Sequence, residues 1–446
     1  MEKDEFKIID ITEDGKGIAK KDSLVYFIKN SNLGDIVSIK NTENKGKYLI
    51  AEKDKVLKEN KFKIKSKCKY FPNCENCVFQ NLKYEKELEF KENKVINNLK
   101  RIGKINLENV KISKIEKSYY EFNYRNKINL KIKDGKIGYN KRKSNEIINI
   151  DRCEIADEKI NEIIKIIANS KNINLKWFNS LMIRCLDNKA QLKFGLDEKT
   201  KEKENKKIKE QEEKLYKELE EKTNIKILGD KLNIKFLDYK ININSKSFFQ
   251  INQKQAEKIY KEINNELEKE NPSKNNVLID LYSGVGISSI IFSKLFKKII
   301  SIEINKESTK AAELNSKANN IKNIEFLNGK AEDLIENLKI EKNSYVFFDP
   351  PRAGLEKNII NKIAENKLKN IIYMSCNSAT LARDLKLFID KGYKLKKIKI
   401  YDMFPKTLHV ETIALLSKLD VDKHIDIQIG LDEMDLTSAE SKATGI

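Results

Sequence analysis

The stretch VLIDLYSGVG, residues 277–286, decides the fold class of the second half of this 446-residue chain. Its first five residues are mostly apolar, a pattern typical of a short buried strand, and its two glycines mark the turn that follows. Similar apolar runs recur further along the chain, with helical patterns between them. These runs are KIISIEIN (298–305), IEFLNG (324–329), YVFFDPPRAG (345–354) and NIIYMSCN (370–377). Strands that alternate with helices predict a doubly wound parallel α/β sheet.

The first two strand ends of this sheet indicate a nucleoside cofactor. The glycines of DLYSGVG let the backbone approach a ligand, and Glu303 ends the next strand, where a carboxylate can accept hydrogen bonds from ribose hydroxyls. The Asp-Pro-Pro of FFDPPRAG resembles the methyltransferase signature that holds a target base beside the methyl donor, which favours S-adenosylmethionine over NAD. Aminomethylases of adenine carry an aromatic residue after the two prolines, whereas this chain carries Arg352. The motif therefore points to a pyrimidine.

A cysteine and a glutamate supply the groups that methylation of a pyrimidine C5 requires. Cys376 ends the apolar run of IIYMSCNSATLARDL (371–385), and Glu411 lies in FPKTLHVETIALL (404–416). Because C5 is a poor nucleophile, a thiolate must first add to C6, and a base must later remove the C5 proton. An isolated cysteine is more often an inert core residue. Its place at a strand end, after the cofactor motifs, favours a nucleophile here.

The order DPPRAG, SCNSATLARDL and FPKTLHVE resembles the RNA uracil-C5-methyltransferase family, and the likeness extends over residues 246–420. The resemblance implies that Cys376 is the nucleophile and Glu411 the proton-abstracting base. It also implies four residues that bind S-adenosylmethionine, namely Gln250, Tyr282, Glu303 and Asp349. The chain departs from the family at Ser378, where proline usually follows Cys-Asn. The thiol of Cys376 and the neighbouring Asn377 are retained, so we expect an active enzyme.

The first 57 residues form short alternating strands with glycine-containing turns, which predicts a small β-barrel. The glycine spacing resembles a TRAM domain, and this resemblance implies an RNA partner. A barrel without a ligand is the alternative. Residues 58–247 mix strands and helices and predict a central α+β domain. Within them, residues 199–222 are almost wholly charged, and we expect a solvated helix without chemistry.

Four of the six cysteines indicate a metal site in the central domain. CKYFPNCENC contains Cys68, Cys74 and Cys77, and Cys153 is a distant fourth candidate. Four thiolates can bind zinc or an iron-sulfur cluster, and three close ligands with one remote ligand suit a cubane better than zinc. The spacing also resembles the ribosomal-RNA branch of the family, where these cysteines hold a 4Fe-4S cluster. Cys185, in a strand pattern without a partner, is most simply a core residue.

The formal charge of +20 suggests a polyanionic partner, although lysine is abundant along the whole chain. Only seven arginines occur, and arginine offers a planar fork for phosphates and bases. We expect Arg125 and Arg142 to contact RNA together with the neighbouring aromatic rings of Tyr124 and Tyr139. The N-terminus has no signal-peptide pattern and no run is apolar enough for a membrane span, so we expect a cytoplasmic enzyme.

Together these features predict a monomeric 23S rRNA uracil-C5-methyltransferase. Its expected parts are a TRAM-like barrel (1–57), a central domain with an iron-sulfur site (58–247), a Rossmann-like catalytic domain (248–420) and an acidic tail without an assigned role (421–446). Three alternatives stay open. One is the related enzyme for the T-loop uridine of tRNA, which would lack the barrel and the cysteines. The others are a radical enzyme that joins a TRAM barrel to an iron-sulfur cluster, and a non-catalytic RNA-binding factor.

Overall fold

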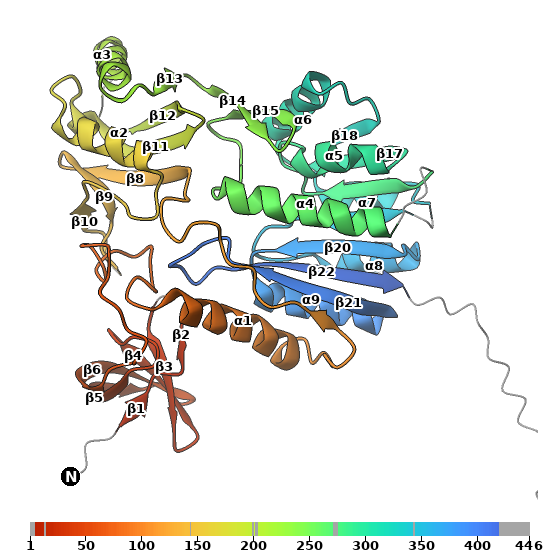
Figure 1. The fold of residues 1–446 in the computed structure, drawn as a ribbon, viewed down its shortest axis with the longest axis horizontal. Helices are drawn as coiled ribbons and strands as arrows, with labels where there is room; N and C mark the ends of the chain where they lie inside the picture. The colour runs from red at the N-terminus through yellow and green to blue at the C-terminus, as the bar shows by residue number, and fades with distance from the viewer. Residues whose placement is uncertain are drawn as a thin grey trace, which may run out of the picture.

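The computed structural model describes residues 5–12, 15–142, 144–198, 200, 204–270, 275–341 and 344–418. The acidic tail expected at residues 421–446 lies outside the described residues. Figure 1 shows three parts: a small N-terminal β-structure, a central sheet covered by two helices, and a large α/β unit with helices on both faces. Within these ranges no helix combines the length and apolarity needed to cross a membrane.

An eight-stranded sheet organises the α/β unit, in the order β18-β17-β16-β19-β20-β22-β21-β7. Strands β16 to β20 run parallel, while β22 is antiparallel to both of its neighbours. The bounds are β16 Val277–Leu281, β17 Lys298–Glu303, β18 Ile324–Asn328, β19 Tyr345–Phe348, β20 Asn370–Ser375, β21 Tyr393–Tyr401, β22 Glu411–Lys418 and β7 Lys111–Ile112. The strand order reverses at β16, which places a ligand crevice at the carboxyl ends of the central strands.

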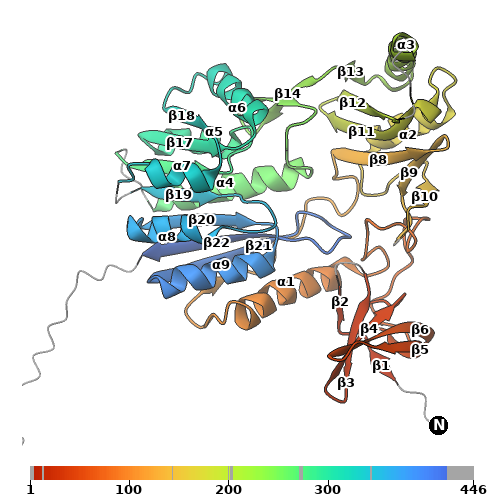
Figure 2. The same ribbon diagram turned by 180° about the vertical axis from the view of Figure 1, so that it is seen from behind.

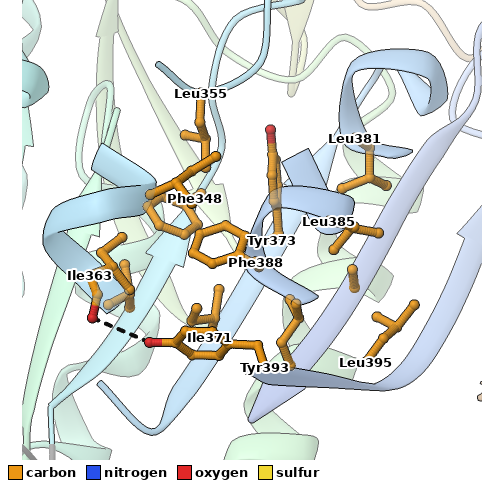
Figure 3. Packing of buried hydrophobic residues seen from close by; sticks show 14 of the residues in the cluster. Phe348, Leu355, Ile363, Ile371, Tyr373, Leu381, Leu385, Phe388, Tyr393 and Leu395 are labelled. Atoms are coloured by element: carbon orange, nitrogen blue, oxygen red, sulfur yellow. Dashed lines mark hydrogen bonds between the residues drawn. The ribbon is translucent and has the colours of Figure 1, made fainter. Parts of the chain in front are cut away.

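Helices cover both faces of this sheet (Figures 1 and 2). One face carries α1 Tyr84–Arg101, α7 Ala331–Asn337, α8 Lys357–Glu365 and α9 Ser378–Asp390; the other carries α4 Gln253–Lys269, α5 Ile287–Phe292 and α6 Lys306–Ala318. Because both faces are covered, the parallel strands are continuous apolar runs, and all four residues of β19 are buried. Figure 3 shows the core under α8 and α9, where the rings of Phe348 and Tyr373 lie 5.6 Å apart.

Two elements join the sheet from outside the expected catalytic segment, 248–420. Helix α1 packs against α9, and β7 pairs in parallel with β21 and forms that edge of the sheet. Both come from the segment expected to form the central domain. The sequence pattern of α1 predicts an amphipathic helix but does not predict which surface its apolar side covers.

The N-terminal strands form one sheet in the order β1-β5-β6-β4-β3-β2, wrapped around a core that includes Phe6, Ile28 and Val37. The strands are β1 Phe6–Lys7, β2 Asp10–Ile11, β3 Gly17–Lys21, β4 Leu24–Lys29, β5 Ile36–Asn44 and β6 Tyr48–Lys58. The closed, TRAM-like barrel stays a prediction, and we call this small β-structure the barrel. Figure 1 places it below the central sheet and next to the amino end of α1.

The central sheet has the order β10-β9-β8-β11-β12-β13 and is covered by α2 Glu158–Asn169 and α3 Asn205–Thr223. Its strands are β8 Lys127–Lys133, β9 Lys136–Asn140, β10 Ile147–Asn149, β11 Phe178–Leu186, β12 Lys189–Leu196 and β13 Lys226–Leu228; the hairpin β14 Lys231–Phe236 and β15 Tyr239–Asn244 leads on to α4. The expectation that residues 199–222 form a solvated helix is wrong in one respect. Ile208, Leu215 and Leu219 of α3 are buried, because their spacing places them on one side of the helix.

Candidate active site

The glycine-rich turn after β16 fixes the carboxylate of Glu303 at the end of β17. Gly284 has a φ of 57° and its N–H donates to Oε2 of Glu303 at 2.9 Å, while the N–H of Asn305 donates to Oε1 at 2.7 Å. Gly286 has a φ of 81°, and a Cβ there would lie 2.9 Å from the Cβ of Ala312. Each oxygen of Glu303 keeps acceptor capacity for a hydroxyl group. The turn therefore fits the ribose of a nucleoside cofactor.

Two of the other residues expected at the cofactor site, Tyr282 and Asp349, lie at the same edge. Tyr282 directly follows β16, and its hydroxyl donates to Glu332 at 2.6 Å, which together with burial raises the pKa of the phenol. Asp349 directly follows β19. Gln250 is only 5% exposed just ahead of α4, and its carbonyl accepts from Nδ2 of Asn126 at 3.0 Å. The carboxyl ends of parallel strands meet at one edge of a sheet, which brings Tyr282 and Asp349 to the edge where Glu303 lies.

A group of buried carboxyls lies at this edge. Burial, and secondarily Asp280, raises the pKa of Asp349 to about 7. Burial, followed by the charge of Asp349, holds the pKa of Glu411 well above its usual value. Oε1 of Glu411 is buried and has no hydrogen-bond partner among the described residues. Burial of a carboxylate oxygen without a hydrogen-bond partner costs folding free energy, and such atoms are typical of functional sites. Oε1 of Glu411 is therefore available to take a proton.

Asp280 is a member of this group that sequence reasoning missed. It lies within β16 rather than at a strand end, and it is fully buried. The hydroxyls of Ser288 and Ser289, at the start of α5, both donate to its Oδ2. Burial nevertheless raises the pKa of Asp280 to about 6. The charged residue in the apolar run VLIDL was the signal that could have identified it.

The thiol of Cys376 lies next to the group of buried carboxyls, and its pKa is influenced by burial and then by Glu411 and Asp349. Strands β20 and β22 pair Ser375 with Thr412, so the adjoining residues Cys376 and Glu411 lie opposite each other. Burial raises the pKa of the half-buried Cys376 thiol to about 11, with further contributions from the charges of Glu411 and Asp349. The cation of Arg352 opposes this shift because it favours the thiolate. The structure thus brings the expected nucleophile and the expected base together.

Asn377 connects the thiol-bearing turn to the Asp-Pro-Pro-Arg turn. Its side chain caps α9 by accepting from the N–H of Ala379 at 3.0 Å, and its Nδ2 donates to the carbonyl of Arg352 at 3.1 Å. Ser378 occupies the first position of α9, where proline is also well tolerated. Its hydroxyl accepts from Nδ2 of Asn98 in α1 at 2.8 Å. The departure from proline therefore leaves the turn intact and adds a contact.

His409 is a second site residue that sequence reasoning missed. Its Nε2 lies 3.2 Å from the guanidinium NH2 of Arg352. Burial lowers the pKa of His409 to about 4, and the charge of Arg352 adds to this effect. The imidazole is therefore neutral at physiological pH. Its position two residues ahead of Glu411 was the available signal.

A buried charge network holds residues 402–410, the loop that leads into Glu411. Nζ of Lys91 in α1 donates to Glu87 and to Asp402, both at 2.7 Å, and to the carbonyl of Phe404 at 3.1 Å. The side chains of Lys91, Glu87 and Asp402 are fully buried. The N–H of Lys406 also donates to Glu87, at 2.6 Å. Helix α1 thus positions the loop through charges that water does not reach.

The four cysteines of the central domain line one small cavity (Cys68, Cys74, Cys77 and Cys153). Backbone N–H groups donate to three of the sulfurs, and Nε2 of Gln80 donates to Sγ of Cys77 at 3.5 Å. Burial raises the pKa of all four thiols. No group of three or more His, Cys, Asp or Glu in the described part of the chain is arranged to hold a metal ion. Cys185, which we expected to be a core residue, is 1% exposed in the core of the central sheet.

The two arginines expected to contact RNA have intramolecular partners. The guanidinium of Arg142 donates to the carbonyls of Cys77 at 2.7 Å and Cys74 at 3.3 Å, and Nε of Arg125 donates to the carbonyl of Lys127 at 3.0 Å. Tyr124 and Tyr139 are only 6% and 8% exposed. The expectation that these two rings stack on RNA bases is therefore wrong, because both rings pack into the protein.

The segment that follows the cysteines also contacts the loop ahead of Glu411. The N–H groups of Val78 and Phe79 donate to the carbonyl of Lys406 at 2.9 and 3.1 Å. The hydroxyl of Tyr124 donates to the carbonyl of Pro405 at 2.9 Å. The cysteine segment and the active site are therefore joined by direct hydrogen bonds.

Comparison with known proteins agrees with this geometry. Residues 83–419 match the family described as tRNA (uracil-5-)-methyltransferase. The chain is 34% identical to an uncharacterized RNA methyltransferase of Clostridium acetobutylicum, over 93% of this chain and 97% of the relative. It is 33% identical to one of Fusobacterium nucleatum, over 93% and 95%. A solved structure, the Pyrococcus abyssi tRNA (uracil-54, C5)-methyltransferase in complex with S-adenosyl-L-homocysteine, superposes with a TM-score of 0.68 at 24% identity and covers 93% of this chain and 100% of its own.

Proposed function

The chain belongs to the tRNA (uracil-5-)-methyltransferase family of S-adenosylmethionine-dependent RNA methyltransferases, and we propose that it methylates C5 of a uridine in 23S rRNA through a covalent adduct on Cys376. The observation that carries this proposal is that Cys376 and Glu411 lie opposite each other at the ends of the neighbouring strands β20 and β22. A nucleophile and a proton-abstracting base at the facing ends of two neighbouring strands can act on C6 and C5 of the same pyrimidine ring.

The reaction begins when Sγ of Cys376 bonds to C6 of the uracil. The electron pair of the C5–C6 double bond becomes available at C5, stabilised as an enolate through the neighbouring carbonyl. S-adenosylmethionine, when bound, would supply the methyl group to C5, and the electron pair of its methyl–sulfur bond would stay on the sulfur of the departing S-adenosylhomocysteine. Arg352 is the cation that favours the thiolate of Cys376 at the start of this sequence.

Glu411 completes the reaction by taking the remaining proton from C5. The electron pair of the C5–H bond restores the C5–C6 double bond, and the bond between C6 and Sγ of Cys376 breaks. The raised pKa of Glu411 makes its carboxylate a stronger base than an exposed glutamate. Its unpartnered Oε1 leaves room for the proton. The residue is thus suited to the step that releases the product.

The uracil has to leave its stack in the RNA to reach Cys376, since the thiol lies at a strand end inside the protein. His409 beside Arg352 provides a neutral ring nitrogen next to a guanidinium whose charge acts on Cys376. Together they offer both hydrogen-bond directions to the carbonyl and N–H groups of a uracil edge. This pair supports a pyrimidine as the flipped base.

The four cysteines support a 4Fe-4S cluster as a second cofactor. Four thiols line one cavity, and N–H groups point at their sulfurs, as is usual around iron-sulfur clusters. The residues that would hold it are Cys68, Cys74, Cys77 and Cys153. When bound, it would supply iron atoms that neutralise buried thiolates and cross-link the cysteine segment to residue 153. We assign it a structural role.

The choice between 23S rRNA and tRNA rests on the cysteines, because the barrel does not separate the two. The tRNA (uracil-54, C5)-methyltransferase of Pyrococcus abyssi covers 93% of this chain, so a tRNA enzyme of this family does not have to lack the N-terminal strands. That finding removes one argument against the tRNA alternative. The spacing of the four cysteines resembles that of the ribosomal-RNA branch of the family and favours rRNA as the substrate. We propose separately that the enzyme is monomeric and cytoplasmic.

Mapping of 5-methyluridine tests the proposed substrate. RNA from cells with and without this gene is compared, and purified enzyme is then supplied with 23S rRNA and with tRNA transcripts. We expect a 23S position to lose its methyl group in the deletion strain and the purified enzyme to restore it. A deletion that removes only the T-loop methyl group of tRNA would establish the alternative instead.

A further inference from the structure

A large cavity lies away from the active site, between the barrel and the cysteine segment. Its volume is about 540 Å³, which lies in the range of small-molecule sites, ~300 to ~1,000 Å³. Barrel residues within 29–35 form one wall, and residues within 71–82 form the other. Arg142 lines the cavity where the two walls approach each other, and its guanidinium lies close to Gly15 of a barrel turn. We call this space the barrel cleft.

We propose that the barrel cleft binds an unpaired nucleotide of the same RNA that is methylated. The inference rests on the proposed function, since it takes RNA as the substrate. It adds a second site of the protein that binds this RNA, separate from the active site at Cys376 and Glu411. The argument comes from the charge, the free amides and the position of the cleft.

The charge of the lining favours a phosphate. Five basic side chains line the cleft, whereas the acidic lining is limited, among the described residues, to the buried Asp35. Both oxygens of Asp35 already accept hydrogen bonds, from the N–H of Asn60 at 2.9 Å and from Nδ2 of Asn32 at 3.1 Å. The basic residues are Lys29, Lys53, Lys63, Lys141 and Arg142. Of these, Lys53 forms no ion pair with any described carboxylate, and its ammonium group is available to an anion.

The amides of the lining favour a base. Asn30, Asn73 and Asn81 line the cleft, and within the described ranges their side chains form no hydrogen bond with the protein. An amide side chain offers two donors and an acceptor, which matches the mixed edge of a nucleobase. Phe71 and Val78 add apolar surface on the cysteine side, against which the face of a base can lie. A simple anion would use the lysines but not these amides.

The position of the cleft favours RNA over a free nucleotide. Val78 lines the cleft, and its N–H donates to the carbonyl of Lys406, in the loop that leads to Glu411. The cleft and the active site therefore lie on two sides of one segment of chain. A strand with one base flipped towards Cys376 can place a neighbouring unpaired nucleotide in the cleft. Unpaired nucleotides are the ones that expose both an edge and a face for recognition.

Paired substitutions in the cleft test this inference. We expect the double variant Lys53→Gln/Asn81→Leu to raise the KM for RNA about tenfold, since it removes one phosphate contact and one hydrogen-bonding contact to the base. Loss of one phosphate contact should also reduce the slope of log affinity against log salt by ~0.7. The kcat and the affinity for S-adenosylhomocysteine should stay at the wild-type level. Lys20→Gln, which removes an exposed charge from the same barrel outside the cleft, is the matched control.

The outcomes separate this inference from the proposed function. RNA binding is measured by filter retention independently of methylation, with whichever RNA the wild type methylates. A double variant that binds RNA like Lys20→Gln overturns the barrel cleft as an RNA site, even if methylation of rRNA is verified. Conversely, if the wild type methylates a tRNA and the double variant binds that tRNA more weakly, the cleft is retained as an RNA site and the rRNA proposal is contradicted.

Two further measurements identify the ligand. RNA that carries 4-thiouridine beside the target is photo-crosslinked to the enzyme, and we expect the modified peptide to lie within residues 29–35 or 71–82. Crosslinks confined to other peptides would overturn the inference. Equilibrium dialysis with the four nucleoside monophosphates covers the other source of the same chemistry. Micromolar binding of a free nucleotide that leaves RNA affinity unchanged would make the cleft an effector site instead.

Discussion

Cys376 and Glu411 lie opposite each other at the ends of two antiparallel strands, because Ser375 of β20 pairs with Thr412 of β22. Their separation is therefore set by the hydrogen-bonded register of the sheet rather than by flexible loops. Strand β22 is antiparallel to β20, so its first residue reaches the edge where the parallel strands end. The antiparallel strand β22 therefore places the proposed proton-abstracting residue, Glu411, opposite the proposed nucleophile, Cys376.

Cys376→Ala should abolish methylation and leave S-adenosylhomocysteine binding nearly unchanged, because the thiol is proposed to attack the base and not the cofactor. RNA containing 5-fluorouridine should form a covalent adduct with the wild type, since fluorine at C5 cannot be removed as a proton. Denaturing gels reveal the adduct. Cys185→Ala is the control, as it removes a buried thiol outside the site. An adduct that persists without Cys376 would exclude this residue as the nucleophile.

Glu411→Gln should form the adduct and transfer the methyl group but fail to release the product. The amide cannot accept the C5 proton, so protein linked to methylated RNA should accumulate with ordinary uridine substrates. Mass spectrometry of the complex, after mixing with S-adenosylmethionine, measures this species. Turnover at the wild-type rate would remove Glu411 from the mechanism.

The pKa of Cys376 should respond in opposite directions to two substitutions. In the free enzyme its pKa is about 11, so alkylation by iodoacetamide should rise with pH up to that range. Glu411→Gln removes a negative charge that disfavours the thiolate and should lower this pKa. Arg352→Gln removes a positive charge that favours the thiolate and should raise it. Shifts in the same direction for both variants would contradict the electrostatic assignment.

Lys91→Met should destabilise the loop that leads to Glu411. The substitution leaves the buried carboxylates of Glu87 and Asp402 without their shared cation, which typically costs ~3–5 kcal/mol. We expect a lower midpoint in urea unfolding and a reduced kcat with little change in KM. Lys94→Met, on the same helix and without an ion pair among the described residues, should behave like the wild type. Equal effects of the two variants would show that the network does not position the loop.

Protein purified without oxygen should contain about four iron and about four sulfide per chain if the four cysteines hold a 4Fe-4S cluster. Cys74→Ser should lose the iron and lower the affinity for RNA more than the affinity for S-adenosylhomocysteine. Cys185→Ser is the matched control, since Cys185 lies outside the cavity and should keep the iron. One zinc per chain without sulfide would replace the cluster by a zinc site.

The sequence determined the parts of this protein that depend on local pattern. Apolar runs with glycine or proline at their ends located the parallel strands. Glu303 and Cys376 were identified because ligands meet at strand ends, and Asp349 was identified through the resemblance of its motif. The spacing of the cysteines likewise pointed to one site, and the structure places all four around one cavity. A strand end is defined by neighbours in the chain, so a single sequence suffices to find it.

Only the tertiary structure decided what depends on contacts between distant segments. Tyr124 and Tyr139 looked available to RNA, yet both are buried, because the exposure of a strand residue depends on what packs over its face. Arg142 turned out to hold the cysteine segment, and Lys91 of α1 turned out to hold the loop ahead of Glu411. The barrel cleft exists only where three distant segments approach each other. Such arrangements follow from the burial of complementary surfaces across the whole fold, and the spacing of residues along the chain does not encode them locally.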